Sequence, residues 1–95
     1  MTITAVTSCA PDVAWVEELV AGSTKLAETR PEIYTLNGHL WVRAEGGLRE
    51  AHAWQVAVGG SIRPSHVHGL VRRQEIWGSR VCVEVIDDPS KAGAR

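Results

Sequence analysis

Residues 48–60 read Leu-Arg-Glu-Ala-His-Ala-Trp-Gln-Val-Ala-Val-Gly-Gly, and the conformation of this stretch decides which fold the chain adopts. Leu48, Ala51, Trp54 and Val58 recur at the spacing of one helix face, whereas Trp54, Val56 and Val58 also alternate as residues of a strand do. The two glycines end the element in either case. Both interpretations stay open on the sequence, and each leads to a different function.

The segment after the glycines predicts a second helix. Val67, Leu70 and Val71 recur at helical spacing. Pro64 suits a helix start, because the N–H that proline lacks would be unpaired there. We therefore predict a helix over residues 64–73.

Two β-hairpins are predicted on either side of this region. Asn37-Gly38 separates two runs rich in β-forming residues, 33–36 and 39–43, and favours a type I′ turn because both central positions need positive φ. A second hairpin is expected around Gly78-Ser79, since valine occupies every second position from residue 81 to 85.

An amphipathic helix is predicted near the N-terminus. Pro11-Asp12 supplies a start signal, and Val13, Val16 and Leu19 follow at helical spacing. We expect one domain over residues 1–95, with residues 1–10 and 88–95 flexible. The predicted fold is α+β: an N-terminal amphipathic helix, an Asn-Gly hairpin, a helix-turn-helix and a C-terminal hairpin.

The composition is that of an ordinary globular protein, with 44 % hydrophobic and 22 % charged residues. Residues 1–50 carry four basic and seven acidic side chains, and residues 51–95 carry six and four, so the halves have net charges of −3 and +2. This asymmetry permits a local basic patch in the second half.

The two cysteines are expected to be free thiols. The sequence shows no leader and no apolar run of about 20 residues, so the protein is expected to be cytoplasmic, with no membrane contact.

With residues 48–58 helical, the second half has the order helix, turn, helix, hairpin. It resembles the winged helix-turn-helix domains of excisionases and MerR-like regulators, and the resemblance lies in Arg-Pro-Ser-His-Val-His-Gly-Leu-Val-Arg-Arg-Gln-Glu-Ile at residues 63–76. A fainter similarity, over residues 31–34 and 64–71 among others, is to accessory segments of phage and plasmid primase-helicase proteins.

The first resemblance implies a small DNA-binding protein, a phage or mobile-element regulator of transcription or a replication accessory factor, acting as a dimer on double-stranded DNA. It implies no cofactor, no metal and no enzymatic activity. Polar side chains would face base edges at Ser65, His66 and His68. Basic side chains would contact phosphates at Arg63, Arg72, Arg73 and Arg80.

Two alternatives from other classes remain. The spacing from Gly60 to His66 and His68 is similar to the first cupin motif, which implies a small β-barrel that binds a metal, because alternate residues of a strand point to the same side. On a helix, the same two rings would lie about 200° apart and could not share a metal. The other alternative is a protein-interaction module of the antitoxin or inhibitor type, with Trp15 and Trp41 on a partner or dimer surface.

Overall fold

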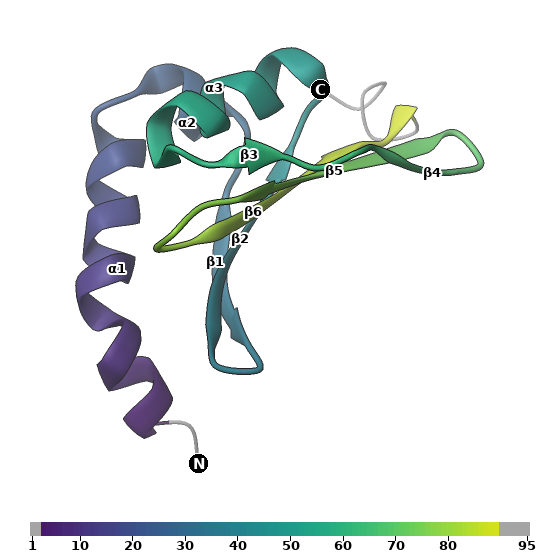
Figure 1. Cartoon of the computed structure of the whole chain (residues 1–95). Helices are drawn as coiled ribbons and strands as arrows, with labels where there is room; N and C mark the ends of the chain where they lie inside the picture. Colours follow the sequence, from purple (N-terminus) through teal and green to yellow (C-terminus); the bar gives the residue numbers. More distant parts are fainter. Residues whose placement is uncertain (1–2, 90–95) are drawn as a thin grey trace.

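The computed structural model describes residues 3–89, with side chains from residue 11 on. In this part of the chain, three helices pack on one face of a six-stranded mixed sheet (Figure 1). The helices are α1 (Ile3–Ala21), α2 (Thr24–Glu28) and α3 (Leu48–Val58). The strands are β1 (Glu32–Leu36), β2 (His39–Glu45), β3 (Ser61–Ile62), β4 (His66–His68), β5 (Val71–Trp77) and β6 (Cys82–Asp87). The expected α+β class is confirmed.

The sheet is open, with the strand order β1-β2-β6-β5-β3, and β4 also pairs with β5. β2 and β6 run parallel, while the other neighbouring strands are antiparallel. The connection from β2 to β6 passes through α3 and the three strands that follow it. Because β1 and β3 lie at opposite ends of the order, the closed barrel expected under the cupin alternative is wrong. Among the described residues, no helix combines the length and the apolar character that a membrane crossing needs.

The helical interpretation of residues 48–58 is confirmed. Ala51, Trp54 and Val58 form the buried face of α3. The Gly47 N–H donates to the Glu50 carboxylate at 2.8 Å at the start of the helix. Gly59 ends it with a φ of 70°, a left-handed conformation that glycine adopts without a steric penalty.

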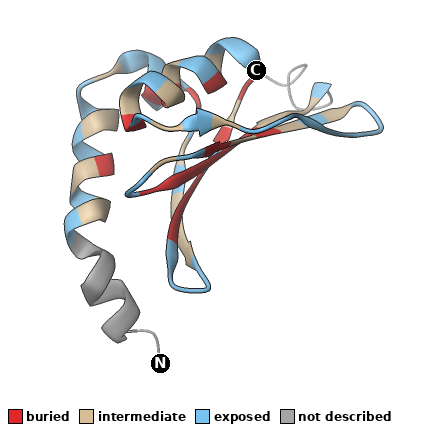
Figure 2. Ribbon diagram, in the orientation of Figure 1, coloured by how far each residue is buried: buried red, intermediate tan, exposed pale blue. Residues whose placement is uncertain are grey.

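The core lies between the helices and the sheet (Figure 2). Trp54 is fully buried, and its Nε1–H donates to Thr29 Oγ1 at 3.1 Å. The Thr29 hydroxyl in turn donates to the Leu26 carbonyl at 2.6 Å, so no polar group of this pair is left unpaired. The alternating valines of the last strand, Val81, Val83 and Val85, are all buried, as their spacing predicts.

Both hairpins are confirmed. Asn37 and Gly38 have φ angles of 52° and 79°, and Leu36 pairs with His39 across this turn. The second hairpin joins β5 to β6 and is longer than expected, because β5 begins at Val71 rather than at residue 75.

The helix expected over residues 64–73 is wrong, because this segment forms β4, a turn at Gly69 and the start of β5. The apolar side chains that suggested the helix do not enter the core: Val67 is 62 % exposed and Leu70 is 82 % exposed. A helix here would have had no apolar surface to pack against, whereas valines favour strands and the φ of 64° at Gly69 suits a turn. The expected helix-turn-helix is therefore not confirmed.

The expected start of the first helix at Pro11 is also wrong. α1 begins at Ile3 and continues through Pro11. A proline inside a helix removes a single hydrogen bond, and here the turns that follow pack Val16 into the core. Of the expected C-terminal tail, residues 90–95 lie outside the described residues.

Candidate nucleic-acid interface

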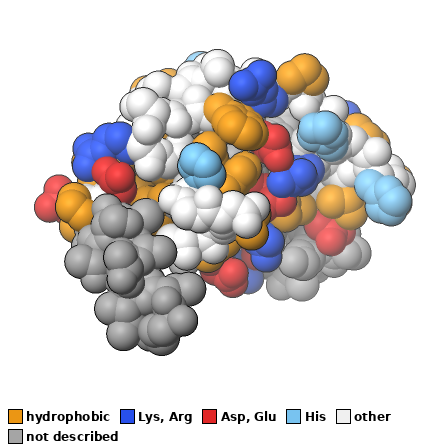
Figure 3. Space-filling view, turned by 60° about the horizontal axis from the view of Figure 1, so that its bottom comes forward, with side chains coloured by type: hydrophobic (Ala, Val, Ile, Leu, Met, Phe, Trp, Pro, Cys, Tyr) orange, Lys and Arg blue, Asp and Glu red, His pale blue; other side chains and the backbone are white. Residues whose placement is uncertain are grey.

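The sheet has one face without helices, which we call the open face. Its side chains follow from the strand register and the alternation of residues along each strand. One row across it consists of Glu32, Arg43, Glu84 and Glu75, and the next of Tyr34, Trp41, Cys82 and Trp77. In Figure 3, hydrophobic, basic and acidic side chains are intermixed where this face is turned toward the viewer.

Glu84 is the buried centre of this face and is only 7 % exposed. Its Oε1 accepts from Arg73 Nε at 2.5 Å, and its Oε2 accepts from Arg43 Nε at 3.4 Å and from the Tyr34 hydroxyl at 3.2 Å. A buried carboxylate needs such partners, because desolvation of an unpaired charge is costly. Glu84 therefore ties together β1, β2, β5 and β6.

The charge on Glu84 affects the groups that bind it. Burial raises the pKa of Tyr34, and the neighbouring carboxylate raises it further, so the phenol keeps the proton that it donates. The hydrogen bond to Glu84 raises the pKa of Arg43. Arg73 bonds a second carboxylate as well, with its Nη2 2.7 Å from Glu75 Oε2. Arg43 and Arg73 thus stabilise the open face.

Trp77 is the most exposed of the tryptophans on this face, at 45 % against 9 % for Trp41. The two rings lie 6.0 Å apart and nearly perpendicular, at 81°. Cys82 lies between them in the strand register. Burial raises the pKa of its thiol, and the charge of Glu75 raises it further, so the thiol stays protonated. A shallow hollow beside Trp77 is lined by Arg63, Pro64, His66, Glu75 and Trp77.

Residues 63–73, which we call the basic ribbon, hold three arginines and no carboxylate. β4 and the start of β5 pair antiparallel here and extend away from the three helices (Figure 1). Every residue from 63 to 70 is exposed. His66 pairs with Arg73 in the register, and Val67 with Arg72, so His66, His68 and Arg73 share the open face while Arg72 lies on the other side.

Six of the seven residues expected to contact DNA lie on this ribbon: Arg63, Ser65, His66, His68, Arg72 and Arg73. Arg80 lies apart from them, in the turn that follows the far end of β5. Its Nε is 2.7 Å from Asp12 Oδ1, and its guanidinium lies 4.2 Å from the centre of the Trp15 ring. Arg80 thereby joins the β5–β6 turn to α1.

The other expected sites differ in geometry from the ribbon. His66 and His68 do lie on one side of a strand, as the metal hypothesis requires. The described side chains, those of residues 11–89, contain no group of three or more histidine, cysteine or acidic residues placed to hold a metal. Trp41 is nearly buried and Trp15 lies under Arg80, so these two rings do not form a common partner surface.

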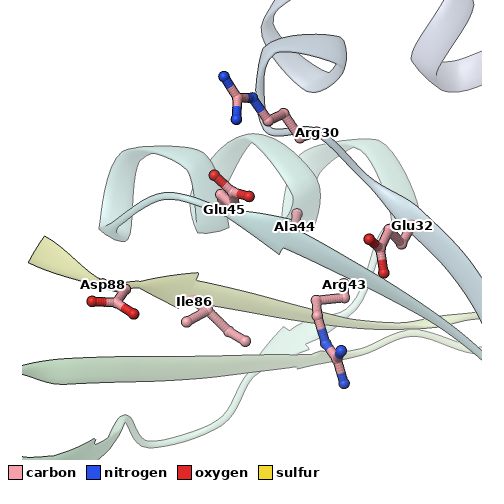
Figure 4. A pocket seen from close by; sticks show the side chains of 7 residues that line it. All are labelled: Arg30, Glu32, Arg43, Ala44, Glu45, Ile86 and Asp88. Carbon is pink, nitrogen blue, oxygen red and sulfur yellow. The ribbon is translucent and has the colours of Figure 1, made fainter. Parts of the chain in front are cut away.

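A cavity of about 130 Å³ lies on the open face, where β2 and β6 end (Figure 4). It is lined by Arg30, Glu32, Arg43, Ala44, Glu45, Ile86 and Asp88. Arg30 and Arg43 point to opposite sides of it, with acidic side chains between them (Figure 4). This mixture of charges does not form a basic surface for a polyanion.

Three residues of this face were not predicted from the sequence to belong to a site: Glu84, Tyr34 and Trp77. Glu84 did carry a signal, because a carboxylate between Val83 and Val85 in a buried strand requires a polar partner.

Comparison with protein-family models, with curated proteins and with solved structures gives no match. A function for this chain therefore has to be argued from the geometry of its own surface.

Proposed function

We propose that this protein binds double-stranded DNA through the basic ribbon, as a cytoplasmic, non-enzymatic regulator or replication accessory factor of a phage or other mobile element. The observation that carries the proposal is the ribbon itself: an exposed segment, part of it a pair of strands, with three arginines and no carboxylate of its own, in a chain whose net charge is −1. The major groove of B-DNA admits a two-stranded β-ribbon as readily as it admits a helix.

The residues of the ribbon have different roles under this proposal. Arg63 and Arg72 are exposed and contact phosphates, while His66 and His68 face the groove. Ser65 contributes less, because its side chain lies on the other face of the ribbon and its hydroxyl accepts from the Gln74 amide. Arg73 contributes less, because Glu84 and Glu75 already bind its guanidinium.

None of the ion pairs among the described side chains involves Arg72. Asp87 is its partner in the register, but the Asp87 carboxylate lies beside Gly47 at the start of α3. Arg80, already paired with Asp12, contributes least to DNA binding.

Binding of a fluorescent duplex, measured by anisotropy over a range of salt concentrations, tests the proposal. Each phosphate contact releases counterions, so two to three contacts predict a slope of log affinity against log salt of about −2 to −3. A duplex that does not bind at low salt, or an affinity that does not change with salt, contradicts the proposal.

A charge-matched pair of double variants separates the ribbon from the rest of the surface. Arg63→Ala with Arg72→Ala should reduce the salt slope by about 2, since each phosphate contact contributes about 1. Lys25→Ala with Arg49→Ala removes the same charge from α2 and α3, where both side chains are exposed, and should leave the slope unchanged. Equal changes in the two double variants would contradict a specific role for the ribbon.

A second candidate function, a protein-interaction module, is favoured by an apolar groove between α1 and α3. Its lining includes Leu19, Leu26, Ala53 and Ala57, with the exposed side chain of Val56 at its edge. We propose a second copy of this chain as the occupant, since two ribbons would double the small number of phosphate contacts that one copy offers.

Light scattering after gel filtration tests this candidate. Self-association that Val56→Glu abolishes is expected, whereas a monomer at every concentration would contradict it.

A further inference from the structure

Trp77 lies directly beside the basic ribbon and is exposed in an unusual way. Its ring is on the open face rather than in the core between helices and sheet. Trp54 is fully buried and Trp41 nearly so, whereas almost half of Trp77 is accessible. Tryptophan is enriched at interaction hot spots, and this accessible ring also lines a shallow hollow, so we consider it as an interaction site.

The ring of Trp77 is also held in a fixed orientation. Its edge-on contact with Trp41 supports one side, and its Nε1–H donates to Glu75 Oε1 at 3.2 Å. Arg73 binds the other oxygen of Glu75, which fixes that carboxylate and offsets its charge. A flat partner that stacks on this ring would therefore pay little conformational entropy on the protein side.

The groups around the ring favour a negatively charged, planar partner. The guanidinium of Arg63 lies over the ring, 5.1 Å from its centre. A base that stacks on this face therefore displaces the guanidinium, which is then free to bind the phosphate next to that base. Arg63, Pro64 and His66 line the hollow next to it, and the basic ribbon continues from there. A nucleotide combines the two required features, a planar base for Trp77 and a phosphate for Arg63.

We infer that Trp77 is a stacking platform for an unpaired base, so that the preferred ligand is a DNA duplex with an adjoining single strand. Bases inside a duplex are stacked on one another and do not present their faces to a protein ring, whereas bases in a single strand do. This inference rests on the proposed function, because the ribbon holds the duplex part of the ligand.

The test compares a blunt duplex, the same duplex with a short oligothymidine overhang and the overhang strand alone. The unmodified full-length protein should bind the overhang duplex about tenfold more tightly than the blunt duplex, which is within the range for stacking of one base on an aromatic ring. Trp77→Ala should lower the ratio of the two affinities, overhang duplex to blunt duplex, from about ten to about one. The ratio is the readout because the loss of the ring also releases Arg63, which changes the blunt duplex affinity itself. Trp77→Phe, which keeps an aromatic face, should retain part of the gain, and thermal unfolding of both variants establishes that they fold.

The outcomes separate this inference from the proposed function. Salt-dependent binding of the blunt duplex without a gain from the overhang, or a gain that survives in Trp77→Ala, would overturn the role of Trp77 and leave the role of the ribbon intact. Tight binding of the single strand alone that is lost in Trp77→Ala would support the platform and contradict duplex binding. No binding of any of the three DNAs at low salt would overturn both.

Discussion

Trp54 and Trp77 lie on opposite sides of the same sheet, and their surroundings differ in every respect. Trp54 is fully buried under α3 and donates its N–H to the hydroxyl of Thr29. Trp77 is 45 % exposed on the open face and donates its N–H to the carboxylate of Glu75. The helix-covered side consists mainly of apolar side chains, whereas charged and aromatic side chains alternate on the open side. We therefore assign stability mainly to the first side, and we propose that Trp77 on the second side takes part in recognition.

The largest expected difference between the two sides comes from alanine substitutions of these tryptophans. Trp54→Ala should lower the free energy of unfolding by about 3–5 kcal/mol, because it leaves a large cavity in a core that cannot collapse around it. Trp77→Ala should cost no more than about 1 kcal/mol, since the ring is partly solvated and its main loss is an aromatic pair. Urea denaturation of both variants measures this, and equal losses would contradict the assignment.

Glu84 differs from the rest of the open side, because its charge is buried and it contributes to stability. Glu84→Gln should lower the free energy of unfolding by about 1–3 kcal/mol, since it removes the charge that Arg43 and Arg73 bind. Glu32→Gln, in the same row but exposed, should stay within about 0.5 kcal/mol of the unmodified protein. Denaturation curves that show the same small effect for both would contradict a stabilising role for Glu84.

The hydrogen bond that anchors Trp54 has a smaller expected contribution. Thr29→Val leaves the Trp54 N–H without its acceptor and should cost about 1–2 kcal/mol. Thr35→Val on the edge strand β1 is the matched control and should have little effect. If the two variants have the same unfolding midpoint, the Trp54–Thr29 bond does not stabilise the core.

The smallest expected effect is a pH dependence that arises from Tyr34. Its pKa in the folded protein is raised above the ordinary value of 10.0, so the unfolded chain releases this proton first as the pH increases. The stability contributed by Tyr34 is thus complete below about pH 10 and is lost as the pH rises through the folded value. Unfolding measured from pH 8 to 11 should show the unmodified protein losing its advantage over Tyr34→Phe above pH 10. A difference that is constant over this range, or that grows, would contradict the raised pKa.

Local patterns predicted those elements whose apolar residues reach the core. The alternating valines at residues 81–85 and the Asn37-Gly38 turn were predicted, because each depends on neighbours within a few residues. The buried face of α3 was one of two interpretations of residues 48–58, and only the structure decides between them. The helix predicted over residues 64–73 was wrong, because the apolar residues of this segment do not reach the core. Their apolar spacing fits a helix, but Val67 and Leu70 have no partner surface in the fold.

The sequence predicted only part of the candidate site. Most of the expected DNA contacts do lie together, because Arg63 and Arg73 are close in sequence and β4 pairs with β5. The Glu84 network was not predictable, since Tyr34 and Arg43 lie 50 and 41 residues away and reach Glu84 only through the parallel pairing of β2 with β6. No local pattern distinguishes Trp77, and only the strand register places it on the open face.

Mapping of the DNA contact by NMR tests the central claim most directly, because it distinguishes the ribbon from α3. A duplex titrated into the ¹⁵N-labelled protein at low salt should shift the backbone amides of residues 61–77 most strongly and leave those of α3 nearly unchanged. Shifts concentrated on residues 48–58, or no shifts at any duplex concentration, would contradict the account.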